Sequence, residues 1–459
     1  MSHNYCILKS LNLKDNNITF DQEFVTNEVI RGVSSLVYHA KLTYIPHRCD
    51  KCGCIYSNHN QFEKHGFKTS LITLPKVSNM NAYLKLKKQR ILCRECSSTF
   101  TLKTSIVEPN CYISNNTKLA ISVEATNIIS ECDIAKRHNI SHSTVNRIIN
   151  SYYEIHHPHR HKLPECLCFD EFKSVKSCDG AMSFIYCDAK TGEIIDIVED
   201  RRLHNLIRYF HRFSREARLN VKVIVIDMYK PYISLIKSVF PNAKILIDRF
   251  HIIQLISRAL NKTRIKIMNN DPKNYNKLKN YWKLLLKNCT DLDILHYRHY
   301  RCFREMLCEE DVVNYLLELN KELKDTYELY QDLLNCIKNN DSERFNFIID
   351  NIQTEYPNIS SYMKIAIKSI KANYEYIINS LKYNYTNGVL EGINNKIKVI
   401  KRIAFGYRSF YHFKVRILIV HKLSKLIKHK KTWSKQICLD QVYQVIGLYL
   451  PTLFDKEPL

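Results

Sequence analysis

The 459-residue sequence predicts a multidomain α/β protein in which helices outnumber strands. Its length corresponds to about three domains at roughly 150 residues each. Between residues 166 and 247, apolar β-rich runs alternate with helical patterns, which is typical of an α/β layer, and long helical patterns follow. Only 9 residues are glycine, and neither a P-loop nor a dinucleotide fingerprint is present, so we expect no glycine-rich phosphate loop.

The charge of the chain indicates a polyanionic partner. Lysine and arginine total 69 against 45 acidic residues, a net charge of +24. A surplus of this size favours nucleic acid first and an anionic membrane surface second. The first 20 residues lack the apolar core of a secretory signal, and no apolar run approaches the ~18 residues of a membrane span. We therefore expect a soluble, cytoplasmic protein without a membrane partner, whose 17 cysteines stay reduced and available for metal.

Changes of composition and periodicity divide the chain into seven segments. A proline-bounded, polar, histidine-rich stretch is the clearest linker. The expected order is an N-terminal region with paired cysteines (1–104), a helical domain (105–155), the linker (156–164), the α/β core (165–249), a long all-α insertion (250–384), a basic helical region (385–431) and a C-terminal tail (432–459).

Two C-x-x-C pairs predict a zinc ribbon. Cys49 and Cys52 form the first pair, and Cys93 and Cys96 form the second. Two thiolates from one tight turn can bind one tetrahedral Zn²⁺ at ~2.3 Å, so two such turns complete a closed site for one structural ion. The stretch between the pairs is longer than in the simplest ribbons, and Cys54 competes as a ligand. Thiols without a metal and a redox dithiol are the alternatives.

Residues 133–150 predict a helix-turn-helix. A short helix over 133–138 contains the small Ala135 where a second helix must cross closely, and residues 139–141 form the turn, with Ser141 as N-cap. The second helix is expected to bury Val145, Ile148 and Ile149. Its exposed side chains are of the types that hydrogen-bond base edges and phosphates, namely His142, Ser143, Thr144, Asn146, Arg147 and Asn150. An ordinary helical hairpin is the alternative.

The α/β core predicts a five-stranded sheet with acidic residues at strand ends. Strands are expected over 167–172, 182–188, 193–198, 221–227 and 243–247, with a helix over about 203–218 and another before the last strand. This is the element order of an RNase H-like, retroviral-integrase-like sheet, in which the first and fourth strands lie side by side. Their ends would bring Asp170 and Asp227 together.

A carboxylate pair at adjacent strand ends has a chemical use. It can bridge two Mg²⁺ ions ~3.5–4 Å apart for phosphodiester chemistry, usually with a third acid. Glu391 is the candidate, because it is the only acid among nine lysines and three arginines between residues 391 and 431. Lys398 follows seven residues later, close to two helical turns, and would meet the DNA backbone from the same face.

Other acids compete for these roles. Glu171 should point away from Asp170 because strand side chains alternate, and Asp179 and Asp188 are expected to serve turns. Asp248 also ends a strand, and we expect it to support the metal ligands or to join them. His251 is a candidate to orient a substrate phosphate, although a buried structural role fits it equally.

The motifs, taken in order, closely resemble bacterial insertion-sequence transposases of the ISL-three family. The resemblance covers about residues 49–420. After the cysteine pairs and the helix-turn-helix, it is carried by Phe-Asp-Glu-Phe (169–172), Val-Ile-Asp-Met-Tyr-Lys-Pro-Tyr (225–232), Asp-Arg-Phe-His (248–251), Asn-Gly-Val-Leu-Glu-Gly-Ile-Asn-Asn-Lys-Ile-Lys (387–398) and Lys-Arg-Ile-Ala-Phe-Gly-Tyr-Arg (401–408).

The resemblance implies a function and a set of site residues. Asp170, Asp227 and Glu391 match the acidic triad that holds two Mg²⁺ or Mn²⁺ ions, and Lys398 matches the basic residue beyond the glutamate. Lys401 and Arg402 would add DNA contacts. The zinc ribbon and the helix-turn-helix would bind the terminal inverted repeats of double-stranded DNA, whose ends are hydrolysed and joined to target DNA. A homo-oligomer near the nucleoid is expected; an RNase H-like nuclease and a non-catalytic DNA-binding regulator are the alternatives.

Overall fold

The computed structural model of the chain describes residues 3–155 and 158–431. The chain forms two compact units, the first from residues 1–157 and 397–459 and the second from residues 158–396. The expected C-terminal tail at 432–459, and His156 and His157 of the expected linker, lie outside the described residues. Within the described part, no helix is both long and apolar enough to cross a membrane.

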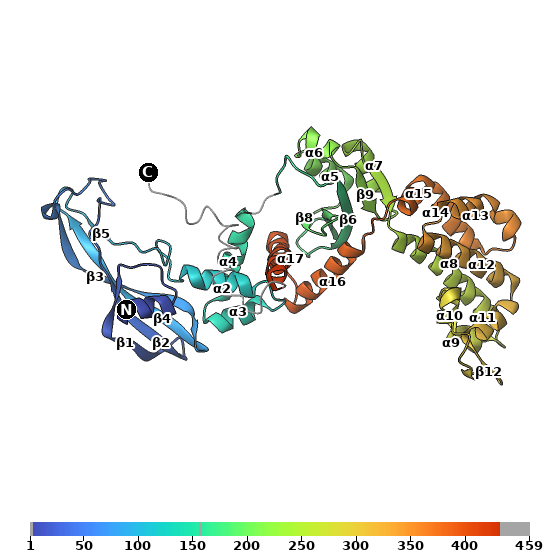
Figure 1. Cartoon of the computed structure of the whole chain (residues 1–459), viewed down its shortest axis with the longest axis horizontal. Helices are drawn as coiled ribbons and strands as arrows, with labels where there is room; N and C mark the ends of the chain where they lie inside the picture. The colour runs from blue at the N-terminus through green and yellow to red at the C-terminus, as the bar shows by residue number, and fades with distance from the viewer. Residues whose placement is uncertain (1–2, 156–157, 432–459) are drawn as a thin grey trace. The chain divides into compact units, whose positions relative to one another are not determined.

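The first unit begins with a helix and a mixed sheet (Figure 1). Helix α1 (His3–Ser10) precedes strands β1 (Ile18–Ile30), β2 (Val33–Leu42), β3 (Phe62–Val77), β4 (Met80–Cys93) and β5 (Thr99–Thr101). The strand order is β1-β2-β4-β3, with β5 beside β4. Strands β2 and β4 run parallel, whereas the other pairs are antiparallel. Alternate side chains of the central strands, such as Leu42, Leu84 and Leu86, are fully buried and form the core.

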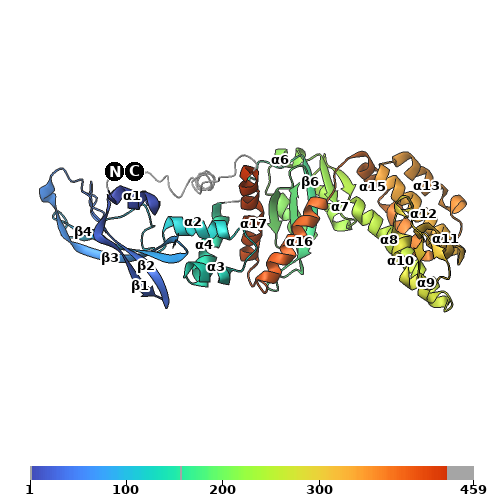
Figure 2. The ribbon, with the colours of Figure 1, turned by 60° about the horizontal axis from the view of Figure 1, so that its bottom comes forward.

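The helical part of this unit joins segments from both ends of the chain (Figure 2). Helices α2 (Asn115–Glu124), α3 (Glu131–His138) and α4 (His142–Ile155) follow the sheet, and α17 (Phe410–Lys431) packs with them. Their shared core contains two side chains from α17, Val415 and Ile419, together with Ile121, Ala125, Ile134, Ala135, Val145 and Ile149. The helix-turn-helix is therefore completed by a helix from far along the sequence.

The second unit is built on a five-stranded sheet. Its strands are β6 (Cys166–Lys173), β7 (Met182–Asp188), β8 (Ile194–Val198), β9 (Val223–Ile226) and β10 (Lys244–Ile247), in the order β10-β9-β6-β7-β8. The adjacency expected for the first and fourth strands is confirmed, because β6 pairs with β9 in parallel. Helices α5 (Leu203–Phe210) and α7 (Lys230–Val239) share an aromatic core with the sheet. The single helix expected over 203–218 is two helices, since Ser214 caps a new one, α6 (Arg215–Leu219).

A helical insertion follows β10. It comprises α8 (Arg249–Asn270), α9 (Tyr275–Asn280), α10 (Trp282–Leu286), α11 (Glu309–Glu318), α12 (Lys321–Asn339), α13 (Ser342–Glu355), α14 (Ser361–Ala372) and α15 (Tyr374–Lys382). The expectation that it is all α-helical needs one correction, because a two-stranded ribbon, β11 (Arg298–His299) with β12 (Met306–Leu307), interrupts the helices. The chain then enters α16 (Gly388–Ile403), which carries Glu391.

Candidate active site and nucleic-acid interface

Two aspartates lie just beyond the point where two parallel strands of the second unit stop pairing, Asp170 within β6 and Asp227 directly after β9. Strand β6 pairs with β9 so that Cys168 lies opposite Val225. Two residues further along each strand are Asp170 and Asp227, so the same register carries their side chains toward each other at one edge of the sheet. Asp170 contacts α16, whereas the adjacent Glu171 accepts a hydrogen bond from Tyr232 on α7. The two neighbouring acids therefore serve opposite faces, as strand alternation predicts.

The environment of Asp170 holds its carboxylate in a low-dielectric setting. Burial is the largest effect, and the carboxylates of Asp227 and Glu171 add to it, so the pKa of Asp170 is raised to about 7. A hydrogen bond from the backbone N–H of Glu171, 2.7 Å from Oδ1, opposes the shift only in part. A carboxyl group that is desolvated and close to another acid is typical of a cation site.

Asp248 and His251 gather at Asp227. Asp248 ends β10 and is the N-cap residue of α8, and His251 lies in the first turn of that helix. The imidazole Nε2 of His251 is 2.8 Å from Oδ1 of Asp227, and this close contact with a carboxylate raises the pKa of His251. Burial raises the pKa of Asp248, which is only 5% exposed. One ligand atom from each of the three residues lies within 4.8 Å of the others.

Helix α16 is docked on this edge of the sheet by two asparagines. The backbone N–H of Asn387 donates to Oδ1 of Asp248, and its side-chain amide donates to the carbonyl of Phe169, both at 3.3 Å. Seven residues later, Nδ2 of Asn394 lies 2.7 Å from Oδ2 of Asp170. At about 100° per residue, Glu391 falls on the same helical face as these two asparagines.

The sequence-predicted residues of α16 differ in their surroundings. Glu391 is exposed, and among the described residues no hydrogen bond or ion pair joins its side chain to Asp170 or Asp227. Lys398 and Arg402 are exposed and Lys401 is half-buried. Asn387 and Asn394 were not expected to take part; their only sequence signal is an amide on each side of Glu391 at helical spacing.

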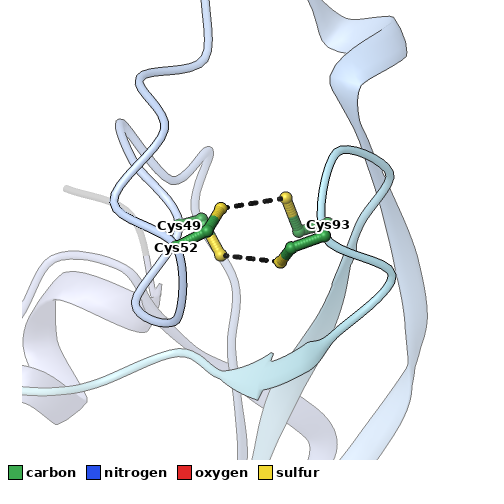
Figure 3. A group of neighbouring side chains, drawn as sticks. Cys49, Cys52 and Cys93 are labelled. Atoms are coloured by element: carbon green, nitrogen blue, oxygen red, sulfur yellow. Dashed lines mark hydrogen bonds between the residues drawn. The ribbon is translucent and has the colours of Figure 1, made fainter.

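The four predicted cysteines form one cluster in the first unit (Figure 3). Sγ of Cys49 lies 3.8 Å from Sγ of Cys96, and Sγ of Cys52 lies 3.9 Å from Sγ of Cys93. Thiolates bound at ~2.3 Å to one tetrahedral Zn²⁺ are separated by about 3.8 Å, so this cluster has the dimensions of a zinc site. The long spacing between the pairs is explained by the β3–β4 hairpin, which brings Phe62 opposite Cys93.

The two cysteine turns are built alike. The backbone N–H of Cys49 donates to the carbonyl of Cys54, and that of Cys93 donates to the carbonyl of Ser98, both at 2.9 Å. Gly53 and Ser97, which follow the second cysteine of each pair, both have positive φ, 78° and 52°. Burial opposes ionisation of Cys93, but hydrogen bonds from Tyr56 and nearby backbone amides lower its pKa to about 6.

Cys54 lies at the edge of the cluster. Its sulfur is 3.3 Å from that of Cys52 and 3.5 Å from that of Cys93. Cys54 is therefore close enough to compete as a metal ligand, as the sequence suggested. The compact group of ligand atoms is formed by Cys49, Cys52, Cys93 and Cys96.

The helix-turn-helix has the expected turn but a partly covered second helix. Ser141 caps α4 by accepting the N–H of Thr144 at 3.3 Å, and Val145 and Ile149 are fully buried, whereas Ile148 is only half-buried. Of the side chains expected to be exposed, His142, Ser143 and Arg147 are exposed, and Thr144 is half-buried.

The expectation that Asn146 and Asn150 are exposed is wrong. Both are half-buried, because His412 of α17 lies between them, with Nε2 at 2.9 Å from Asn146 and Nδ1 at 2.8 Å from Asn150. The same imidazole Nε2 is 2.6 Å from a carboxylate oxygen of Glu131 on α3. Helix α17 therefore covers α4 at Asn146 and Asn150 and leaves His142 and Ser143 in its N-terminal turn exposed.

Arg416 anchors α17 to the helical domain. It is 2% exposed, although it belongs to the basic helical region expected at 385–431. Its guanidinium donates to the carbonyls of Ala125, Asn127 and Ile129, at the end of α2 and in the following turn. Basic residues of α17 are thus structural in part, a role that the net charge alone does not reveal.

With the sheet, the acidic edge and the helix-turn-helix described, comparison with known proteins shows the class of protein to which the chain belongs. The profile of the ISL3 family, DDE_Tnp_ISL3, described as Transposase, matches residues 167–417. The chain therefore belongs to the ISL3 transposase family.

Two relatives were found. The transposase for insertion sequence element IS1001 of Bordetella parapertussis is 26% identical over 261 residues, which cover 55% of this chain and 60% of that protein. A protein of Lactococcus lactis subsp. lactis named ATP-dependent protease is 40% identical over 118 residues, covering 25% of this chain and 36% of the relative. The chain thus spans less than two thirds of either relative.

Proposed function

We propose that the protein is a DDE transposase with an RNase H-like catalytic core, which cleaves DNA at the ends of an insertion sequence and joins those ends to target DNA. The observation that carries this proposal is the pairing of β6 with β9, which brings Asp170 and Asp227 to one sheet edge against the helix that bears Glu391. The strand order β10-β9-β6-β7-β8 supports the RNase H-like assignment.

The acidic edge fits divalent metal ions. Asp170, Asp227 and Glu391 supply carboxylate oxygens, the ligands that Mg²⁺ and Mn²⁺ prefer, and Asp248 and His251 lie beside Asp227 to support or share the coordination. Two such ions, when bound, activate the attacking hydroxyl and stabilise the leaving oxygen of a phosphodiester. The protein residues themselves hold the carboxylates in register, exclude water around Asp170 and place α16 beside them.

The first unit is suited to recognise the terminal inverted repeats. The exposed N-terminal turn of α4 would enter the major groove with His142, Ser143 and Arg147, supported by Thr144, while Asn146 is held by His412 and would act on DNA only indirectly. One structural Zn²⁺ in the cysteine cluster would fix the sheet domain beside it. Lys398, Lys401 and Arg402 would contact the phosphate backbone, and a homo-oligomer would hold two ends together.

A binding and cleavage assay tests the proposal. Purified protein is mixed with Mg²⁺ and a labelled duplex that carries the inverted repeat flanking its own gene, and wild type is compared with Asp227→Asn. We expect both proteins to bind the repeat and only wild type to cut at its end. Cutting of any duplex without preference for the repeat would favour the nuclease alternative, and binding without cutting would favour the DNA-binding regulator.

A further inference from the structure

Asn394 makes the most direct contact between α16 and a catalytic aspartate. Its side chain lies one helical turn beyond Glu391 and is 9% exposed. Nδ2 is 2.7 Å from Oδ2 of Asp170 and 3.3 Å from the backbone carbonyl oxygen of Glu171. Both partners are acceptors, so the amide must present its NH₂ group to them.

This arrangement admits few other side chains. A carboxylate at position 394 would lie against the carboxylate of Asp170, and an apolar side chain would supply no donor. The orientation of the amide also leaves Oδ1 of Asn394 buried without a hydrogen-bond partner among the described residues. A buried acceptor left unpaired costs free energy, so the amide contacts Asp170 at the expense of its own oxygen.

The contact fixes Asp170 at both of its oxygens. Oδ1 accepts the N–H of Glu171 at 2.7 Å, and Oδ2 accepts Nδ2 of Asn394 at the same distance. Each carboxylate oxygen can accept two hydrogen bonds or ligands, so one acceptor site on each oxygen remains for a cation. The carboxylate is thereby held in one rotamer before any metal binds.

The same contact places the third acid. Asn394 ties α16 to β6, and Asn387, two turns earlier, ties it to Asp248. Glu391 lies between these two attachment points on the same helical face. Its position relative to Asp170 therefore depends on both asparagines.

We propose that Asn394 is a positioning residue, which orients the Asp170 carboxylate for metal and registers the helix that delivers Glu391. The inference rests on the proposed transposase function. Loss of the Asn394 amide should weaken metal affinity and slow the chemical step while leaving DNA affinity unchanged, because both partners of the amide, Asp170 and the carbonyl of Glu171, lie on β6.

The test compares Asn394→Leu with Asn314→Leu, an exposed asparagine of α11 in the helical insertion, in the full-length protein. Mn²⁺ affinity is measured by titration with electron paramagnetic resonance. End cleavage of the repeat duplex gives kcat and KM, and the thermal unfolding temperature shows whether each variant is folded. We expect Asn394→Leu to lower Mn²⁺ affinity and kcat, each by roughly 10- to 100-fold, with KM within about twofold of wild type. Asn314→Leu should match wild type in Mn²⁺ affinity, cleavage kinetics and unfolding temperature.

The outcomes separate the inference from the proposed function. Wild-type Mn²⁺ affinity and kcat in a folded Asn394→Leu protein would overturn the positioning role. If leucine prevents folding, Asn394→Ala, which also lacks the donor but favours helix, is measured in its place. If wild type binds Mn²⁺ but cuts no DNA, the proposed function fails, and the Mn²⁺ titration still decides the role of Asn394. If wild type binds no Mn²⁺, the proposed function and the positioning role both fail.

Discussion

Arg416 should be a principal stabilising residue of the helical domain, and Arg416→Met tests this. Methionine keeps an unbranched side chain of similar reach in the core but removes every N–H donor. The carbonyls of Ala125, Asn127 and Ile129 then lose their charged hydrogen-bond donor, Arg416, which is only 2% exposed. These carbonyls end α2 and shape the turn before α3, so the whole helix-turn-helix depends on them.

The size of the effect follows from the three hydrogen bonds. A buried acceptor left unpaired costs about 1–3 kcal/mol. The lower value applies to each of the three carbonyls, because replacing Arg416 also removes the free-energy cost of burying its charge. We therefore expect the free energy of local unfolding to fall by about 3 kcal/mol. Under conditions where exchange follows the opening equilibrium, this corresponds to roughly 100-fold faster amide hydrogen exchange.

Hydrogen exchange with mass spectrometry measures the effect in the full-length protein. Peptides from α2, α3 and α4 should exchange faster in Arg416→Met, while peptides from β6 to β10 in the other unit serve as the internal reference. Arg402→Met, at an exposed position of α16, is the matched control and should leave the exchange of α2–α4 unchanged. Exchange of the α2–α4 peptides within about threefold of wild type would refute the anchoring role of Arg416.

Three further predictions concern the candidate sites. The protein should bind one Zn²⁺ per chain, and Cys93→Ser should abolish zinc binding and lower the unfolding temperature. Metal analysis and calorimetry measure the two effects. Full zinc occupancy in the variant would contradict the four-thiolate site. Arg147→Ala should weaken binding to the repeat by at least about tenfold in fluorescence anisotropy, whereas an equal loss in Asn150→Ala would contradict the covering of that residue by α17. Because burial raises the pKa of Asp170 to about 7 and metal requires its charged form, Mn²⁺ affinity should fall as the pH is lowered from 8 to 6, and a flat titration would contradict this.

Local sequence signals predicted the elements that carry the candidate active site. The apolar runs around Asp170 and before Asp227 predicted the strands, and the adjacency of the first and fourth followed from the RNase H-like fold that this element order indicates. The C-x-x-C spacing predicted the cysteine cluster, since each pair is closed by its own tight turn. Each strand and each cysteine turn is specified by residues close together in the sequence, and the order of the elements along the chain did the rest.

Contacts between distant segments escaped sequence reasoning. Nothing local to Asn146 indicates that His412 lies against it, so an exposed helical face was expected where α17 packs. Arg416 belongs to a basic stretch whose composition indicates a charged surface, yet its neighbours Val415 and Ile419 bury it. Likewise, Asn394 is an unremarkable polar residue until α16 is placed against β6. The roles of Asp170, Asp227 and Glu391 in catalysis remain predictions.

Strand transfer by the purified protein is the measurement that tests the proposed chemistry most directly. Wild type, Glu391→Gln and the control Glu375→Gln, an exposed glutamate of α15, are incubated with Mg²⁺, a repeat-bearing duplex with a 3′-hydroxyl end and plasmid target. We predict that wild type and the control join the end to plasmid and that Glu391→Gln binds the repeat but joins nothing, a loss of at least about 100-fold. Joining by Glu391→Gln at the wild-type rate would contradict the assignment of Glu391 as the third catalytic acid.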